Sequence, residues 1–320
     1  MTGHRTQVTQ AGRAALRVLA PMAGLPPGGW QVTLLSARRE RQGARGVLRA
    51  DPAQGQGAPL PSVIVKLHLP VAAARFEAMR TGHAAAARAL PDGVPAVLAA
   101  CEAHGALLLS CAQGAPVWEV LSQRADGAGP ADILTAAGAW LGRFHKGAAR
   151  GTEALETEGP LRRLRRLAKT RDVPQPQAYR AALGALETLG QQAQNPTPHA
   201  VIHGDMTLQN LLVTPDLRVT GIDFENADAA PAMRDLAGLV VDDAIWFGAG
   251  GAIDLGAQAP LLRGYIGSGG TVDAAALRFF VGVKLLGLWA AQPARDADRS
   301  ARRAYVWSRL QEITPEFFTL

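Results

Sequence analysis

Alternating apolar and polar positions near the start of the chain predict a small β-sheet. The predicted strands are short, and segments containing glycine and proline separate them. Two helices accompany the strands: residues 9–19 carry apolar side chains on one side, and residues 71–90 follow the third strand. The strands are expected at residues 30–35, 46–49, 62–69, 97–103 and 106–110.

The segment between the first two predicted strands, residues 36–46, has two glycines among several arginines. In a loop, its backbone N–H groups and positive charge would be available to phosphate groups. A hairpin tip exposed to solvent is an equally good interpretation. The sequence therefore predicts a loop here and leaves its ligand open.

Beyond residue 117 the apolar positions follow the period of an α-helix. His145 lies in one such stretch and is interpreted as a packed or capping histidine. Residues 151–160 are expected to form a loop, and Pro231 is expected to open a later helix. One helix face carries Leu134, Ala137, Leu141, Phe144 and Ala148, spaced three and four apart. Further helices are expected at residues 161–169, 177–192, 231–246, 259–266, 274–291 and 294–313.

Residues 200–226 interrupt the helical pattern and hold most of the candidate chemistry. Two apolar runs, 210–213 and 217–222, are joined by a Thr-Pro-Asp turn, so a β-hairpin is predicted. Because a hairpin returns to its starting point, the polar residues at its ends are expected to lie close together. These residues are His203, Asp205, Asn210, Asp223 and Glu225.

Two carboxylates and an amide at one end of a hairpin form an oxygen-only set of ligands. Such a set suits Mg²⁺ better than Zn²⁺. A buried polar turn without chemistry is the alternative, but these groups are costly to bury without a ligand. Asp205, Asn210 and Asp223 are therefore the candidate site.

The spacing within this segment resembles that of kinases. Asn210 follows Asp205 by five positions and Asp223 follows it by eighteen, with His203 and Gly204 directly before Asp205. The combination resembles the aminoglycoside phosphotransferase and choline kinase superfamily, the small-molecule relatives of protein kinases. The resemblance is specific in this segment, weaker over residues 62–141, and little more than a helical pattern after residue 243.

The resemblance implies an α+β fold of the protein-kinase-like, two-lobed type. Residues 1–110 would form an N-lobe with a five-stranded nucleotide-binding sheet and one helix, and residues 111–117 a hinge that binds adenine. Residues 118–320 would form a mainly helical C-lobe that contains the catalytic hairpin. Asp235, followed by leucine, resembles the aspartate that anchors the catalytic loop in this family.

The same resemblance assigns a role to each candidate residue. Asp205 would accept the proton of a substrate hydroxyl, while Asn210 and Asp223 would hold Mg²⁺ at the phosphates of ATP. Lys66 stands in the middle of an apolar strand, where it would bind the nucleotide phosphates. Its partner would be Glu77, the only acid in the helix that follows. A lysine at a strand edge that reaches water is the alternative.

The implied activity is ATP-dependent transfer of the γ-phosphate to a hydroxyl of a small molecule. An aminoglycoside, a choline-like amino alcohol and a sugar all remain candidate acceptors. Acidic residues after the hairpin favour a cationic acceptor, with Glu225, Asp242 and Trp246 as candidate contacts. Asp242 and Trp246 are four positions apart on one helix face, although a solvated acid beside a core tryptophan would look the same.

Two other functions are weighed against this one. A pseudokinase, which binds nucleotide and acts as a regulator or scaffold, is the alternative from another class. A protein kinase is disfavoured because no long activation segment and no Ala-Pro-Glu motif separate Asp223 from Asp235. The presence of all the polar groups favours the enzyme.

Composition excludes several further classes. The net charge is +6 and the pI about 9.9, yet most arginines are single, and no zinc-finger spacing or aromatic RNA-binding signature is present. Nucleic acid is therefore not expected as a partner. Only Cys101 and Cys111 are available, so disulfides do not organise the fold. No apolar run approaches the ~18 residues of a membrane span, and a cytoplasmic protein without membrane association is expected.

Overall fold

The computed structural model describes residues 2–40, 43–53, 60–123, 129–193 and 195–319. The chain folds into two compact units. The first unit contains Met1–Gly114 and Thr220–Ala227, and the second contains Ala115–Val219 and Asp228–Leu320. The segment Thr220–Ala227, which the sequence placed with the helical part, thus groups with the sheet. The predicted hinge at 111–117 stays a prediction.

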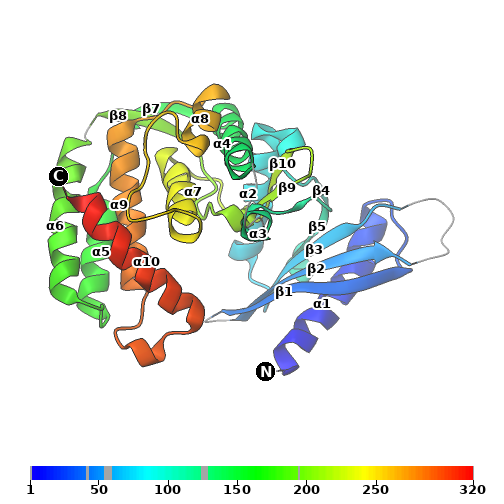
Figure 1. Cartoon of the computed structure of the whole chain (residues 1–320). Coiled ribbons are helices and arrows are strands. Elements are labelled where there is room, and N and C mark those ends of the chain that lie inside the picture. The colour runs from blue at the N-terminus through cyan, green and yellow to red at the C-terminus, as the bar shows by residue number, and fades with distance from the viewer. Residues whose placement is uncertain (1, 41–42, 54–59, 124–128, 194, 320) are drawn as a thin grey trace. The chain divides into compact units, whose positions relative to one another are not determined.

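A five-stranded antiparallel sheet forms the centre of the first unit, with the strand order β1-β2-β3-β5-β4 (Figure 1). Each predicted strand is present, because alternating or continuous apolar runs bury one or both sides of a pleated strand. The strands are β1 (Trp30–Glu40), β2 (Gly43–Pro52), β3 (Val63–Leu69), β4 (Val97–Cys101) and β5 (Ala106–Ser110).

The loop predicted at residues 36–46 is wrong for residues 36–40 and 43–46, which form paired strands. The strands β1 and β2 continue through most of this segment, where Arg38 pairs with Arg45 and Arg39 with Ala44. The sequence misled here because a strand requires only backbone pairing, and its exposed positions tolerate arginine. Residues 41 and 42 lie outside the described residues.

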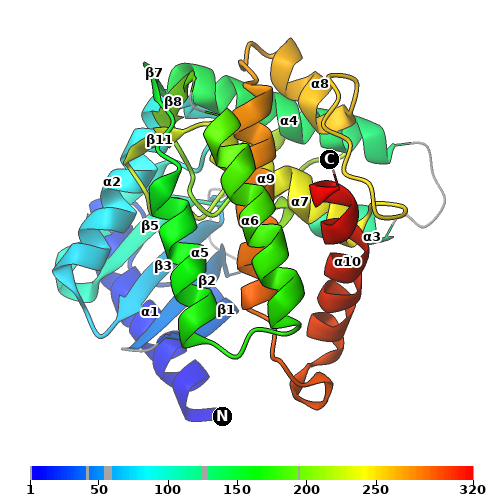
Figure 2. The same ribbon diagram turned by 90° about the vertical axis from the view of Figure 1, so that its left-hand side faces the viewer.

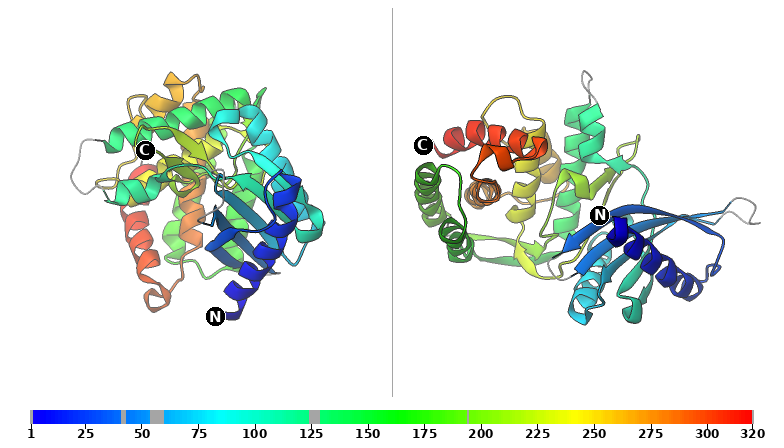
Figure 3. Two further views of the ribbon diagram at one scale, coloured as in Figure 1. Left: turned by 90° about the vertical axis from the view of Figure 1, so that its right-hand side faces the viewer. Right: turned by 90° about the horizontal axis from the view of Figure 1, so that it is seen from below.

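Two helices, rather than the one that the resemblance implied, cover opposite faces of this sheet. The helix α1 (Thr2–Met22) lies against the strands (Figure 3) and packs its Leu16 and Leu19 on the face that contains Val65. The helix α2 (Ala73–Ala89) packs Phe76 and Met79 on the other face. Because successive strand residues point to opposite faces, the side chain of Lys66 lies on the face of the sheet opposite to that of Val65.

Helices build most of the second unit. The helix α9 is apolar on nearly all sides, and such a helix is buried at the centre of its neighbours. Figure 2 shows α5 and α6 beside it, and α7 and α10 also contact it. The helices are α3 (Val117–Gln123), α4 (Pro130–Gly147), α5 (Glu158–Thr170), α6 (Pro176–Gln192), α7 (Met233–Trp246), α8 (Pro260–Gly267), α9 (Ala274–Ala290) and α10 (Ala301–Phe318).

A small antiparallel sheet in the second unit corrects two predicted boundaries, and a third is corrected in the last helix. It consists of β7 (Ala149–Ala154), β8 (Pro196–Val201) and β11 (Ala229–Pro231). The expected loop at 151–160 is therefore partly a strand, whose exposed side chains leave no alternating signature. Pro231 ends a strand instead of opening α7, and the last helix begins seven residues later than predicted, at Ala301 rather than Ala294.

The predicted hairpin is present. Its strands are β9 (Leu211–Val213) and β10 (Val219–Gly221), which are neighbours in a sheet that also contains β6 (Ala115–Pro116). The N–H of Thr214 donates to the carbonyl of Arg218 at 3.0 Å and closes the turn. No helix in the described part of the chain is both long enough and apolar enough to cross a membrane.

Candidate active site

Lys66 lies in the middle of β3, with a side chain that is only 3% exposed. Its ammonium nitrogen lies 2.7 Å from Asp223 Oδ1 and 2.8 Å from Glu225 Oε1. Burying a charge costs several kcal/mol unless oppositely charged partners compensate for the lost water. The two carboxylates supply this compensation, so the lysine is not a strand-edge residue that reaches for solvent.

Arg45 on β2 is a second cation at the same carboxylates. Its Nη2 lies 3.2 Å from Asp223 Oδ2, and its Nη1 lies 2.8 Å from Glu225 Oε1. His68 Nε2 lies 3.6 Å from the same glutamate oxygen. We refer to Lys66, Arg45, Asp223 and Glu225 as the charge cluster, in which two positive side chains balance two negative ones.

The charge cluster keeps both carboxylates ionised. Burial alone would raise the pKa of Asp223, but the charges of Lys66 and Arg45 outweigh it and lower that pKa. Burial also opposes ionisation of Glu225, but the nearby His68 and the charges of Lys66 and Arg45 lower its pKa well below the usual range. Both carboxylates are therefore available as anionic ligands at neutral pH.

The backbone at Asp223 adopts a left-handed conformation, with φ of 70°. This region is uncommon for residues other than glycine, although aspartate adopts it more readily than most, and such residues cluster at active sites. The next residue, Phe224, is 1% exposed and packs edge-on against His83 of α2. At Gly82 a Cβ atom would lie 2.8 Å from the backbone nitrogen of Asn226, so only glycine lets this segment pass α2.

The predicted pair of Lys66 with Glu77 is not formed in this structure. Glu77 is 51% exposed and forms an ion pair with Arg80, at 2.7 Å from Oε1 to Nη2. The reason is the rotation of α2: Phe76 and Met79 face the sheet, which turns Glu77 toward solvent. Glu225, instead of Glu77, contacts the lysine.

Asp235 of α7 anchors the backbone of the loop that carries Asp205. The Asp235 carboxylate, 1% exposed, accepts hydrogen bonds from the backbone N–H groups of His203 at 2.6 Å and Gly204 at 2.9 Å. His145 Nε2 lies 3.3 Å from the same carboxylate, and its Nδ1 lies 3.0 Å from the hydroxyl of Tyr265. The predicted anchoring by Asp235 and the packed role of His145 are confirmed.

Asp205 and Asn210 lie on this one loop. Asp205 is exposed, and its backbone carbonyl accepts a hydrogen bond from Asn210 Nδ2 at 2.8 Å. With its nitrogen committed, the amide of Asn210 has its oxygen available to a cation. At Gly238 of α7 a Cβ atom would lie 2.5 Å from the carbonyl of Met206, so this glycine permits the close approach of the loop.

The expected convergence of Asp205, Asn210 and Asp223 stays a prediction. Asp205 and Asn210 belong to the second unit, whereas Asp223 belongs to the first. Their assignment to one site rests on their spacing in the sequence. Within the first unit, the structure itself brings Asp223 to Lys66, which the sequence had separated by more than 150 positions.

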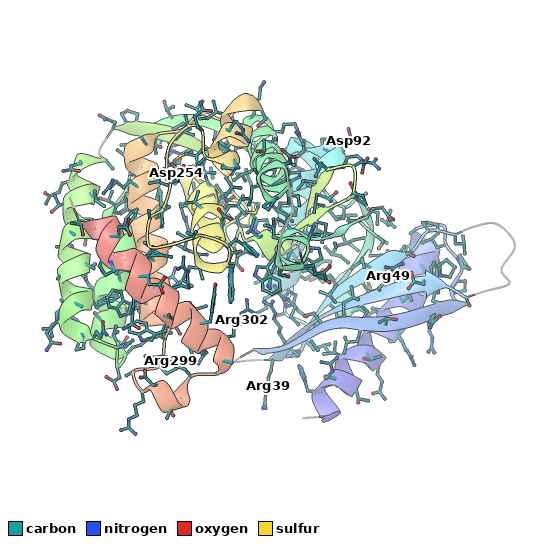
Figure 4. The ribbon with its side chains drawn as sticks, in the orientation of Figure 1. Arg39, Arg49, Asp92, Asp254, Arg299 and Arg302 are labelled. Carbon is teal, nitrogen blue, oxygen red and sulfur yellow. The ribbon has the colours of Figure 1, made fainter. Side chains whose placement is uncertain are left out.

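Trp246 lies in an aromatic group of the second unit, which we call the aromatic cluster: Trp118, Trp246 and Tyr305. Tyr305 stacks on Trp246 with ring centroids 5.2 Å apart, and Trp118 packs edge-on against Trp246 with centroids 5.7 Å apart. The guanidinium carbon of Arg302, near the start of α10 (Figure 4), lies 5.1 Å from the Trp246 ring centroid. Trp246 therefore already holds a cation against its ring.

Asp242 and Asp243 precede Trp246 on α7. Asp242 Oδ2 accepts a hydrogen bond from the N–H of Leu208 at 2.8 Å, so this carboxylate also supports the loop. Burial raises the pKa of Asp242, and burial together with the Asp242 charge raises the pKa of Asp243 to about 6. The role of Asp242 and Trp246 in acceptor binding stays a prediction.

Comparison with known proteins decides the family. The profile of the phosphotransferase enzyme family matches residues 44–280, most of the chain. The chain belongs to this family. Comparison with curated proteins gave no match. The predicted family, the protein-kinase-like fold class and the activity of a small-molecule phosphotransferase are thereby confirmed.

Solved structures share the fold of this phosphotransferase. A choline/ethanolamine kinase family protein from Mesorhizobium loti is 19% identical with a TM-score of 0.60, covering 98% of this chain and 95% of that one. Amicoumacin kinase in complex with AMP-PNP, Ca²⁺ and Ami is 16% identical with a TM-score of 0.54, covering 90% and 88%. Choline kinase from Streptococcus pneumoniae is 14% identical with a TM-score of 0.53, covering 90% and 93%.

Three residues of the phosphotransferase escaped the sequence analysis. Arg45 was one of several arginines, and only the strand register places it opposite His68, beside the charge cluster. Trp118 and Tyr305 lie far from Trp246 in the sequence, on α3 and α10. A tryptophan shortly after a proline, as at Trp118, is too common a pattern to have identified it.

Proposed function

We propose that this phosphotransferase transfers the γ-phosphoryl group of ATP, with Mg²⁺, to a hydroxyl group of a small cationic acceptor. The observation that carries the proposal is the charge cluster, in which a buried lysine and an arginine meet two ionised carboxylates. Positive charge for a polyphosphate and oxygen ligands for a divalent cation are thus supplied side by side.

The residues present fit a nucleotide and a divalent metal. Lys66 and Arg45 would contact the phosphates, and Asp223 and the amide oxygen of Asn210 would hold the metal. A bound Mg²⁺ would neutralise the charge that develops on the phosphates during transfer. Amicoumacin kinase, which shares the fold, was solved with AMP-PNP and Ca²⁺.

Asp205 acts as the base in this proposal. Its carboxylate orients the acceptor hydroxyl and takes up its proton while the acceptor oxygen bonds to the γ-phosphorus. The bond between that phosphorus and the β,γ-bridging oxygen breaks, and ADP leaves with the electron pair. The buried bonds of Asp235 to His203 and Gly204 fix the backbone that carries Asp205, which supports positioning as the main contribution.

The acceptor class is proposed from groups of the second unit. Asp242 and Asp243 add negative charge on α7, and an acceptor cation would replace the Arg302 guanidinium that now lies against the Trp246 ring. A small ammonium or amino compound that bears a hydroxyl is the acceptor that such groups favour. Choline-like amino alcohols and aminoglycosides meet this description, and a neutral sugar does not.

The proposal is tested by ADP release from ATP and Mg²⁺ with choline, ethanolamine, gentamicin, spectinomycin and glucose as separate acceptors. We expect turnover with a cationic acceptor, and loss of that turnover in Asp205→Asn. The exposed Asp132 of α4 offers a matched control, and Asp132→Asn is expected to keep full activity. Nucleotide binding without turnover of any acceptor would favour the pseudokinase, and full activity of Asp205→Asn would contradict the assigned base.

A further inference from the structure

Glu225 was predicted as an acceptor contact, and that role stays a prediction. In the structure, one of its carboxylate oxygens contacts both cations of the charge cluster. Its Oε1 receives Lys66 Nζ at 2.8 Å and Arg45 Nη1 at 2.8 Å, with His68 Nε2 at 3.6 Å. Asp223 divides its contacts, with Oδ1 toward Lys66 and Oδ2 toward Arg45. The two carboxylates thus share both cations.

We propose that Glu225 is the residue that positions Lys66 for nucleotide binding, in place of an acid on α2. The inference rests on the proposed function, in which Asp223 is a metal ligand. A metal that takes Asp223 withdraws one of the two carboxylates that contact Lys66. Glu225 is the carboxylate that remains and holds a 3% exposed lysine at the same place.

The helix α2 offers no competing acid. Glu77 is its only carboxylate, and Arg80 holds it on the exposed side of the helix through two hydrogen bonds of 2.9 and 2.7 Å. A cavity of about 300 Å³, lined by His68, Arg75, Ala78 and Glu225, lies between the start of α2 and the glutamate. An acid reaching from the helix would have to cross this space.

The backbone secures Glu225 where it is. A Cβ atom at Gly82 of α2 would lie 3.0 Å from the carbonyl carbon of Glu225. The preceding Phe224 is buried against His83. The segment that carries Asp223 and Glu225 is therefore held against α2 by backbone contact and by the Phe224–His83 ring contact, and α2 acts on Lys66 through this segment instead of through an acidic side chain of its own.

Replacement of Glu225 has a specific consequence for metal-dependent binding. In Glu225→Gln, Lys66 keeps only Asp223 of the two carboxylates in the charge cluster, and the buried lysine then competes with the metal for it. We expect AMP-PNP in the presence of Mg²⁺ to bind about tenfold or more weakly, and the Mg²⁺ concentration for half-maximal binding to rise. Glu225→Asp keeps the charge and should recover part of the affinity.

The test measures AMP-PNP binding to the full chain by calorimetry over a series of Mg²⁺ concentrations. Glu77→Gln is compared directly with Glu225→Gln, and we expect its affinity to stay within about twofold of the unmodified chain. Glu102, exposed in the turn before β5, supplies a control in Glu102→Gln. Thermal unfolding of every variant establishes that it is folded.

A cycle with Lys66→Met separates positioning from a general structural effect. If Glu225 acts through the lysine, Glu225→Gln adds no further loss of affinity to Lys66→Met. Equal, additive losses in both backgrounds would overturn the proposal, as would weak binding in Glu77→Gln with normal binding in Glu225→Gln. If Glu225→Gln does not fold, the same comparison is made with Glu225→Asp. Failure of the unmodified chain to bind AMP-PNP would instead overturn the proposed function and this inference with it.

Discussion

The buried carboxylate of Asp235 holds the backbone of the loop that carries Asp205. It accepts two backbone hydrogen bonds, from His203 and Gly204, and contacts His145, while only 1% exposed. In Asp235→Asn the shape is kept, but one carboxylate oxygen becomes an NH₂ donor. At least one of the three donors then loses its acceptor and faces another donor.

The magnitude follows from these contacts. Leaving a buried donor unpaired costs about 1–3 kcal/mol, and hydrogen bonds to a charged acceptor contribute about 1.5–3 kcal/mol each. Because the asparagine oxygen still accepts part of this hydrogen bonding, we expect the free energy of unfolding to fall by about 3 kcal/mol. The loop that holds Asp205 should shift as well, and a displacement near 1 Å at a catalytic group costs about a hundredfold in turnover.

Urea unfolding at neutral pH measures the loss of unfolding free energy, and ADP release measures the loss of turnover. Asp242→Asn is the comparison, since Asp242 accepts one backbone hydrogen bond from Leu208 and should cost about 1 kcal/mol. The pH dependence adds a check of sign. Burial opposes ionisation of Asp235, but its hydrogen bond to His145 and the nearby charges lower its pKa, so its contribution is lost as pH falls through that lowered pKa. An Asp235→Asn variant with unchanged unfolding and turnover would refute this account of the loop.

Three further predictions follow from the other carboxylates and from the aromatic cluster. Asp223→Ala should abolish Mg²⁺-dependent binding of AMP-PNP while the fold persists; calorimetry that shows unchanged binding would remove Asp223 from the metal site. Asp243, with a pKa raised to about 6, favours folding when protonated, and this contribution is lost as pH rises from about 4 to above 6. Asp243→Asn should therefore raise the unfolding free energy at pH 8 by about 1 kcal/mol, an estimate reduced for partial exposure, and change it little at pH 4. Trp246→Leu should lower kcat/KM for a cationic acceptor by about tenfold or more, since a desolvated cation–aromatic contact contributes about 2 kcal/mol. An equal loss for a neutral acceptor would indicate a packing defect.

The sequence by itself determined the elements whose signals are local. The strands of the first unit follow from apolar alternation, because successive side chains of a strand point to opposite faces. The hairpin at Leu211–Gly221 follows from a turn of Thr, Pro and Asp between apolar runs. The spacing of Asp205, Asn210 and Asp223 is likewise a property of the linear chain, and it predicted the family that the profile match confirms.

Only the tertiary structure decided which charged groups meet. Glu77 was the nearest acid after Lys66, but the rotation of α2 turns it to solvent, while Glu225 arrives from a distant segment. Arg45 reaches the same carboxylates because strand register places it there. Partner choice depends on helix rotation, register and chain return, which are set by the packing of the whole unit. A single sequence records the residues that carry charge, and long-range packing determines which of them are close enough to pair.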